Sequence, residues 1–556
     1  MVERCLGSLC FTQLMTSDAK FFGFSEFLAG LALMILAWTI ADVSYKFRIA
    51  TAPVPLRRLT FYTVTIIGLL TLLTDLWRAE QWFVPKGDLL TPPTWQAFLG
   101  FVFFITFLSW AWYAFIRPPI FGRSSAKHFV HAIYHFVLKG TQAELAVVAD
   151  ELRRSAKNIV KYSVNHGGEG SHRVESFRTI FGSPTVSSYA EDILMLISER
   201  RFCKAVVDSS PGTALEIFLA MKEFKKYSIR IDVFSKNIIN YALMNKESFL
   251  YQEAGDYNSG LIGHFKPLTQ AMFSDHSMVE EINSMFELDL WGDFSFAAPH
   301  WEAYCRIVLM TYKDKVDNDF WGSSRSLWHA FENIRRAAHD LYKLNGVADY
   351  SLNEDSVKKL RVIVNFIKDV VSVLEKRGVP DYLPWKKKGT FETHYDQLAS
   401  LIFEIIHSAA AVQGPQGLSW WMHYNMLWGE LFGSFSSKGA AAQIIMFKLR
   451  RLIYNEIEQM KKVPNYKGAK IVCFFLNVVG LLPSKFASRN ENIIRNIMVC
   501  WAKNYYVTLH RKNPQVAAQC LVDGIIYDDL RMRLIKTYSP NALRPKPKMV
   551  YLQLMA

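Results

Sequence analysis

Three long apolar runs, separated by short polar loops, occupy the first 126 residues. The runs extend from Phe21 to Val43, from Leu59 to Trp77 and from Trp95 to Ile116. An α-helix needs roughly 20 apolar residues to cross the hydrocarbon core of a bilayer. The third run is the clearest, because no charged residue lies between Asp88 and Arg117. A buried soluble hairpin would also be apolar, but three such runs are more typical of membrane spans. The pattern therefore predicts a three-span transmembrane domain over residues 1–126.

After residue 126 the apolar positions recur at helical spacing. A helix is predicted from Lys127 to Leu138, and Thr141 with Glu144 forms a capping box that opens a second helix. Both helices belong to a juxtamembrane segment with a linker, residues 127–170. The linker falls in a polar, glycine-rich stretch from Asn165 to His172, which is typical of a boundary.

A helix–strand alternation follows, between Tyr189 and Phe234. It comprises a helix from Tyr189 to Arg200, a strand from Cys203 to Asp208, a helix from Pro211 to Lys226 and a strand from Ile229 to Phe234. Alternation of this kind is typical of α/β folds. It predicts a small α/β unit over residues 171–276.

From about residue 277 the pattern is helical almost throughout. The predicted helices run from Trp321 to Leu344, Ser356 to Arg377, Phe391 to Val412, Leu418 to Phe435, Ala440 to Lys462, Lys470 to Leu482 and Ser488 to His510. We divide this region into a helical domain, residues 277–437, and a basic helical C-terminal module, residues 438–556. The predicted fold class is a membrane protein with three N-terminal transmembrane α-helices and a mainly α-helical cytosolic region with a small α/β unit.

Lysines and arginines beside the apolar runs predict an orientation. Those in the first loop and just after the third run are Lys46, Arg48, Arg57, Arg58, Arg117, Arg123 and Lys127, and those on the opposite side are Arg4, Lys20, Arg78 and Lys86. Because positively charged loops tend to stay in the cytosol, the amino terminus is predicted outside and the chain after Arg117 inside. In a bacterium, the protein would belong to the inner membrane.

The whole basic excess of the chain lies in the C-terminal module. Residues 438–556 hold 20 lysines and arginines against 6 acids, a net charge of +14, which equals the net charge of all 556 residues. Such a module beneath a membrane predicts binding to anionic lipid, a nucleic acid or an acidic protein partner. A solvated basic surface that binds nothing is the alternative.

Two acids lie inside the predicted spans. Glu26 and Asp75 both fall about one turn from the outer interface. They could line a lumen or join protomers, but snorkelling towards the headgroups explains them better. Three spans are too few for a transporter built from repeats, so a pore would need several copies. We expect a homo-oligomer embedded in membrane lipids.

The best small-molecule candidate is the turn Asp208-Ser209-Ser210-Pro211-Gly212. Free amides at the start of a helix bind anions, and an acid at a strand end in an α/β unit commonly lies near a ligand. The turn lacks the nucleotide fingerprints GxGxxG and GxxxxGK[ST], and a plain corner needs the same residues. Asp208, Ser209, Ser210 and Gly212 are therefore a candidate ligand site, and no cofactor is predicted.

Three histidines lie on one stripe of the first juxtamembrane helix. His128, His131 and His135 are spaced i, i+3 and i+7, which would suit a shared metal or a pH switch. No acid or cysteine close in sequence completes a metal site. An interfacial helix that shows its histidines to headgroups is the favoured interpretation.

A third candidate is a polar face on the helix that starts near Arg325. Its members are Arg325, His329, Glu332, Arg336 and Asp340. Glu332 to Arg336 and Arg336 to Asp340 have the spacing of ion pairs. Histidine beside arginine and acids would suit acid–base cleavage of a phosphodiester, whereas a solvated or interdomain charged face is the favoured interpretation.

The remaining cysteines and aromatics give weaker signals. Cys5 and Cys10 could pair on the predicted outer side, and the other five cysteines lack metal-ligand spacing. The aromatic cluster from Trp420 to Phe435 predicts a buried core or an interface between subunits.

The architecture resembles that of membrane-anchored sensors and effectors, including some bacterial defence proteins, by analogy alone. We expect an integral membrane sensor, effector or scaffold whose cytosolic body binds a ligand or partner and is coupled to an oligomeric membrane domain. The alternative is a membrane-tethered enzyme or binder that acts on nucleotides or nucleic acid through Asp208 or the His329 helix. The sequence has no Ser-His-Asp order, HExxH or zinc-type cysteine pair, which favours binding over catalysis.

Overall fold

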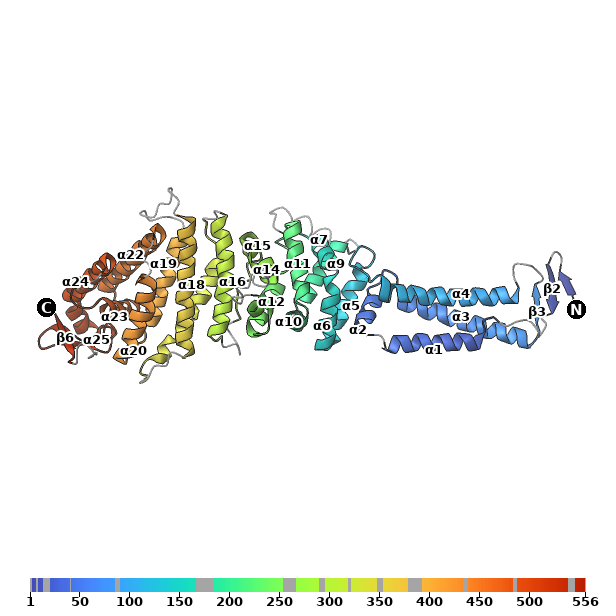
Figure 1. The fold of residues 1–556 in the computed structure, drawn as a ribbon, viewed down its shortest axis with the longest axis horizontal. Helices are drawn as coiled ribbons and strands as arrows, with labels where there is room; N and C mark the ends of the chain where they lie inside the picture. Colours follow the sequence, from blue (N-terminus) through green and yellow to red (C-terminus); the bar gives the residue numbers. More distant parts are fainter. Residues whose placement is uncertain are drawn as a thin grey trace. The chain divides into compact units, whose positions relative to one another are not determined.

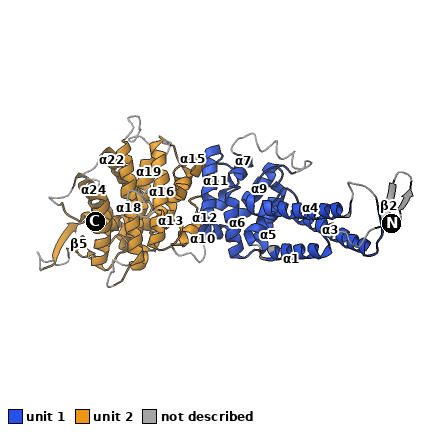
Figure 2. Cartoon of the chain, turned by 45° about the vertical axis from the view of Figure 1, so that its right-hand side comes forward, with its two compact units in different colours: residues 1–238 blue, residues 239–556 orange. Residues whose placement is uncertain are grey.

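The described part of the protein is mostly helical, at 74%, with a small part in antiparallel sheet. The computed structural model describes residues 3–6, 9–13, 21–40, 42–85, 91–166, 184–253, 267–289, 296–318, 322–347, 354–378, 393–433, 439–483, 488–538 and 546–555. The chain divides into two compact units, residues 1–238 and 239–556 (Figure 2).

Unit 1 begins with three long helices that lie side by side (Figure 1). They are α1 (Phe24–Ile40), α3 (Leu56–Ala79) and α4 (Pro92–Ala111), which continues as the π-helix η1 (Trp112–Ile116). The short helix α2 (Val43–Ala50) joins α1 to α3. At the other end, β1 (Glu3–Leu6), β2 (Leu9–Gln13) and β3 (Phe83–Pro85) form an antiparallel sheet in the order β1-β2-β3.

Two of the three predicted spans are long and apolar enough to cross a membrane, namely 56–79 and 93–116. The first predicted run does not meet this test, so the prediction of three spans is corrected to two candidates. Its helix α1 has 17 residues, of which 24–36 form the apolar part. At about 1.5 Å per residue this helix covers roughly 26 Å, less than a ~30 Å hydrocarbon core. The run is interrupted because Asp42 caps a new helix, α2.

Glycines let phenylalanine rings pack between these helices. The Phe27 ring of α1 lies over Gly68 of α3, where an added Cβ would come within 2.8 Å of it. The Phe103 ring of α4 lies over Gly30 of α1 in the same way, at 2.9 Å. Phe27, Val64 and Ile67 form the buried centre of this contact. Small residues at such positions allow helices to approach closely.

The two acids predicted inside the spans cap the start of α1. Asp75 of α3 accepts a hydrogen bond of 2.8 Å from the Phe24 amide, and Glu26 accepts one of 2.9 Å from the Gly23 amide. Amides in the first turn of a helix have no partner within the helix, so carboxylates there stabilise it. Both acids thus have a capping role, and the snorkelling and lumen interpretations stay predictions.

The remainder of unit 1 is a packed set of helices. They are α5 (Ala126–Lys139), α6 (Gln142–Arg153), α7 (Ala156–Tyr162), α9 (Val186–Ile197), α10 (Arg200–Ser209) and α11 (Pro211–Phe224), followed by α12 (Asp232–Met244), which contains the boundary between the units. The predicted capping box is confirmed: Thr141 Oγ1 accepts from the Glu144 amide, and Glu144 accepts from the Thr141 amide.

The predicted α/β unit is wrong, because both of its strands are absent. The segment 203–208 lies within helix α10, where Phe202, Cys203 and Val206 are buried at helical spacing and Glu199 caps the first turn. The segment 229–234 is a bend that leads into α12. Over the described part of residues 184–253 there is no strand.

Unit 2 is helical with a terminal sheet. Its helices are α13 (Phe249–Gln252), α14 (Pro267–Phe273), α15 (His276–Ile282), α16 (Ala298–Asp317), α17 (Arg325–Arg336), η2 (His339–Leu344), α18 (Asp355–Arg377), α19 (His394–Ala409), α20 (Gln416–Trp420), η3 (Trp421–Phe432), α22 (Ala440–Lys462), α23 (Tyr466–Val479), α24 (Arg489–Lys512) and α25 (Pro514–Ala518). The sheet pairs β4 (Ile525–Asp528), β5 (Arg533–Tyr538) and β6 (Lys548–Gln553) antiparallel around β5. The C-terminal module, predicted as wholly helical, therefore ends in a sheet.

Candidate functional site

Helix α2 positions an arginine at the base of the three long helices. Asp42 starts the helix by accepting a hydrogen bond of 2.7 Å from the Val43 amide. Phe47, one turn later, is buried and meets the Phe129 and Phe136 rings of α5 edge-on, with centroids 5.9 and 6.1 Å apart. Aromatic pairs with this geometry fix relative orientation, so α2 is held firmly against α5.

Arg48 joins three segments that are far apart in the sequence. Its Nε and Nη2 donate to the two carboxylate oxygens of Glu151 on α6, at 2.9 and 2.5 Å. Its Nη1 donates to the Ala114 carbonyl of η1 at 3.0 Å. The guanidinium thus ties α2, the end of α4 and α6 together with three hydrogen bonds.

This contact lies in a largely dry environment. The Arg48 side chain is 14% exposed and that of Glu151 8%. The hydrogen bond to Glu151 raises the pKa of Arg48, although burial opposes it. A bidentate arginine–carboxylate pair has a fixed planar geometry, and a cation beside the last carbonyls of a helix is favourable. The arrangement is suited to holding three segments in register.

An apolar cluster surrounds the arginine contact on the side of the long helices. Its buried members are Ile49, Ala52, Leu56, Trp110 and Ala114, from α2, the start of α3 and the end of α4. The segment between α1 and α3 therefore contributes buried residues to the same cluster as the end of α4 and η1.

The Asp208 turn is a corner between two helices. Asp208 and Ser209 end α10 and are exposed, whereas Ser210 is buried. Thr213, beside it, donates a hydrogen bond of 2.6 Å to the Ala149 carbonyl of α6. The Arg153 guanidinium lies over Gly212, 3.1 Å from where a Cβ would stand. The four residues do come together, but not at a strand end, and ligand binding there stays a prediction.

The three histidines of α5 lie where the sequence places them, on one helix. His131 and His135 are exposed and His128 is half-buried. In the described stretches no group of three or more His, Cys, Asp or Glu side chains could hold a metal ion.

The five residues of the predicted polar face near Arg325 contact different partners. Glu332 pairs with Arg335 and, at 3.7 Å, with Arg336, so that predicted pair forms. The predicted Arg336–Asp340 pair does not form, because α17 ends at Arg336 and Asp340 pairs with Lys359 at 2.9 Å. Arg325 is exposed, and its amide donates to Glu280. His329 is half-buried against Trp328. Three of the five residues, Glu332, Arg336 and Asp340, are therefore in ion pairs, and a catalytic role for the face stays a prediction.

Of the two interpretations of the aromatic helix, the buried core is confirmed for most of η3, and an interface between subunits stays a prediction. Met422, His423, Leu427 and Trp428 of η3 are buried. His423 is fully buried: its Nε2 lies 3.0 Å from the Ala409 carbonyl and its Nδ1 3.1 Å from the Asn477 amide nitrogen. A carbonyl accepts and an amide nitrogen donates, so the ring is neutral with its proton on Nε2. Burial lowers the pKa of His423 to about 4.

Some lysines of the basic C-terminal module form ion pairs or hydrogen bonds within the protein. Lys448 pairs with Asp396 and Lys467 with Glu404 at 2.6 Å. Lys536 is buried and donates to the Leu476 and Asn477 carbonyls at the end of α23, and burial lowers its pKa to about 7. The surface charge available to a partner is therefore smaller than the sequence count, and binding to lipid, nucleic acid or an acidic protein stays a prediction.

Of the five cysteines whose side chains the structure describes, four are buried and Cys500 is exposed. Cys203, Cys305, Cys473 and Cys520 are buried, and burial raises the pKa of each thiol. The backbone register places Cys5 opposite Cys10 on β1 and β2.

Sequence reasoning missed the Arg48 contact, in which one side chain joins α2, α6 and η1. One signal was present: Leu145, Val148 and Leu152 define the buried face of α6, and Glu151 lies beside them. Comparison with protein families, curated proteins and solved structures finds no match for this chain.

Proposed function

We propose that this chain is an integral membrane protein that acts as a sensor, effector or scaffold, and that its helical body is coupled to its membrane helices through Arg48. The observation that carries the proposal is the bidentate contact of Arg48 with Glu151 together with its hydrogen bond to Ala114. A conformational change of the helical body that moves α6 would therefore also move η1 through Arg48, and η1 continues directly from α4.

Exposed apolar surface supports the membrane assignment. Only 28% of the apolar stretch of α3 and 17% of that of α4 is buried inside the protein. The large apolar side chains that these two helices expose include Leu59, Phe61, Ile66, Leu69, Leu72, Leu73, Phe98, Phe101, Phe104 and Ile105. A core helix of a soluble protein would be covered, and exposed apolar surface of this extent is typical of an interface with a membrane or partner.

The segments at the two ends of the long helices α1, α3 and α4 agree with the proposed orientation in the membrane. β2 pairs with β3, so the chain before α1 and the loop between α3 and α4 share one side. α2 and the helices after η1 share the other side, where Lys46, Arg48, Arg57 and Arg58 also lie. Helix α1 joins the same two sides and packs on α3, so we propose that it accompanies the two candidate spans despite its shorter apolar part.

A topology experiment tests this arrangement. A reporter fused after Gly140 should read as cytosolic, and one inserted between Trp82 and Pro92 should read as external, because of the asymmetry in lysine and arginine. The full-length chain should also resist extraction from membranes by alkaline carbonate. The reverse reporter pattern, or a protein released by carbonate, would refute the proposal.

The competing proposal is a membrane-tethered enzyme or binder acting on nucleotides or nucleic acid. Its candidate residues are Asp208 and the face that contains His329. Glu332 and Asp340, the acids of that face, are engaged by Arg335 and Lys359. This pairing supports a structural role for the face and favours the coupling proposal.

A further inference from the structure

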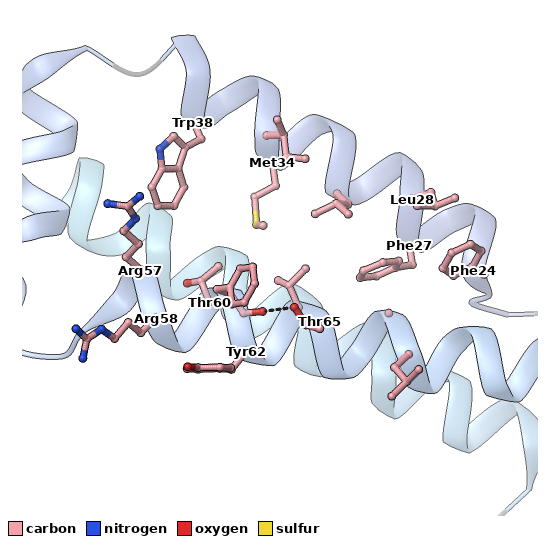
Figure 3. Close-up of a pocket in the computed structure, with 16 residues that line it drawn as sticks. Phe24, Phe27, Leu28, Met34, Trp38, Arg57, Arg58, Thr60, Tyr62 and Thr65 are labelled. Atoms are coloured by element: carbon pink, nitrogen blue, oxygen red, sulfur yellow. Dashed lines mark hydrogen bonds between the residues drawn. The ribbon is translucent and has the colours of Figure 1, made fainter.

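A groove runs between α1 and α3, with a volume of about 840 Å³ (Figure 3). It forms because the contact of Phe27 with Gly68 holds the amino-terminal part of α1 close to α3, while the rest of α1 is separated from α3. Leu31, Met34 and Trp38 of α1 line one side of it. The volume lies within the ~300–1,000 Å³ typical of ligand pockets.

The two ends of the groove differ in chemistry. The end near the start of α1 is lined by Phe24, Phe27 and Leu28, and the opposite end by Arg57 and Arg58 (Figure 3). Both arginines are exposed, and of the described residues that line the groove none is acidic. Neither arginine has an ion pair with any described carboxylate. The groove is therefore an apolar channel that ends in two positive charges, for which the described residues supply no partner carboxylate.

We propose that this groove binds one anionic membrane phospholipid, with an acyl chain between α1 and α3 and the phosphate on Arg57 and Arg58. The proposal rests on the membrane assignment made above. Acyl chains match the apolar lining, and arginine binds phosphate oxygens in a bidentate manner. A second copy of the chain is a poorer occupant, since a twofold contact through this surface would bring like charges together.

The expected preference follows from the two charges. Each arginine near a membrane surface favours an anionic lipid over a neutral one, so two should give a roughly 30-fold preference for phosphatidylglycerol over phosphatidylcholine. Binding of the two lipids to the detergent-purified full-length protein can be compared by native mass spectrometry. The Arg57→Gln/Arg58→Gln variant should lose this preference. The Arg117→Gln/Arg123→Gln variant removes the same charge just beyond η1, outside the groove lining, and should keep it.

A second pair of variants tests the channel itself. Met34→Trp should fill the groove and weaken the binding of both lipids, whereas Leu33→Trp, at the adjacent position outside the lining and 68% exposed, should leave binding unchanged. Equal binding of the two lipids by the wild type, or a preference kept by the Gln pair, would overturn the proposal. The proposal would also be overturned if Met34→Trp removed the oligomer from the mass spectrum without changing lipid binding. That result would assign the groove to a second copy of the chain. If carbonate extracts the chain, the membrane assignment fails as well; if it does not, only the lipid site is lost.

Discussion

Replacing Glu151 with leucine is expected to loosen α2 and η1, although the substitution is on α6. The change leaves the Arg48 guanidinium in a site that is 14% exposed, with its two carboxylate contacts removed. Breaking a buried pair by removing one partner costs roughly 3–5 kcal/mol. Hydrogen–deuterium exchange of the full-length protein in detergent should therefore be faster in peptides that cover residues 43–50 and 112–117.

Two further variants separate coupling from general damage. Glu216→Leu removes an acid from α11 that lies 3.8 Å from Arg153, where both side chains are largely exposed. Exposed pairs contribute about 0–1 kcal/mol, so this control should leave exchange in α2 and η1 unchanged. The double variant Arg48→Met/Glu151→Leu replaces the pair with apolar groups of similar size and should restore much of the protection. If exchange in α2 and η1 is as slow in Glu151→Leu as in Glu216→Leu, the contact of Arg48 with Glu151 does not couple the segments.

Long helices were predictable because their signals extend over many residues. The helix predicted from Ala440 to Lys462 matches α22, and the capping box of Thr141 and Glu144 forms as expected. Such helices have both a periodic apolar face and terminal residues that satisfy free amides. Local sequence was sufficient there.

Short apolar stretches do not specify a helix or a strand by themselves. The segment 203–208 contains adjacent valines and ends in a turn, which suits a buried strand as well as a helix, and four to six residues do not distinguish the two. The surrounding helices decide, because 202, 203 and 206 face them at helical spacing. On β5, by contrast, Lys536 occupies an inward position beside Leu534. A buried lysine conceals the alternation that would have revealed the strand.

The Arg48 contact could not have been predicted with its partners. Glu151 is 103 residues away in sequence, and Ala114 contributes only a backbone carbonyl. Nothing in the local pattern specifies which acid a loop arginine meets, because the pairing depends on how α5 and α6 pack. The groove was hidden for the same reason: Arg57 and Arg58 were counted as charges, whereas their role depends on where α1 separates from α3.

Unit 2 is expected to lose stability as the pH falls from 6.5 to about 4, because of His423. In the folded protein burial lowers the pKa of this ring to about 4, whereas in the unfolded chain it is near 6.5. Between these values the unfolded state binds a proton that the folded state does not, so stability is full above pH 6.5 and is lost as the pH falls. For His423 the loss should reach roughly 3 kcal/mol.

The test follows exchange protection in α19 and α23, the helices that hold His423 through Ala409 and Asn477. His423→Gln keeps a donor for the Ala409 carbonyl and an acceptor for the Asn477 amide but cannot take up a proton, so it should reduce the acid sensitivity. Other histidines of unit 2 contribute to the sensitivity that remains: burial lowers the pKa of His407 on α19 to about 4, and it also lowers the pKa of His276 and of His300. His329→Gln, in the same unit but half-buried beside Trp328, should behave as the wild type. Equal acid sensitivity in His423→Gln and His329→Gln would show that the buried ring is not the titrating group, since the two variants differ in the burial of the histidine they remove.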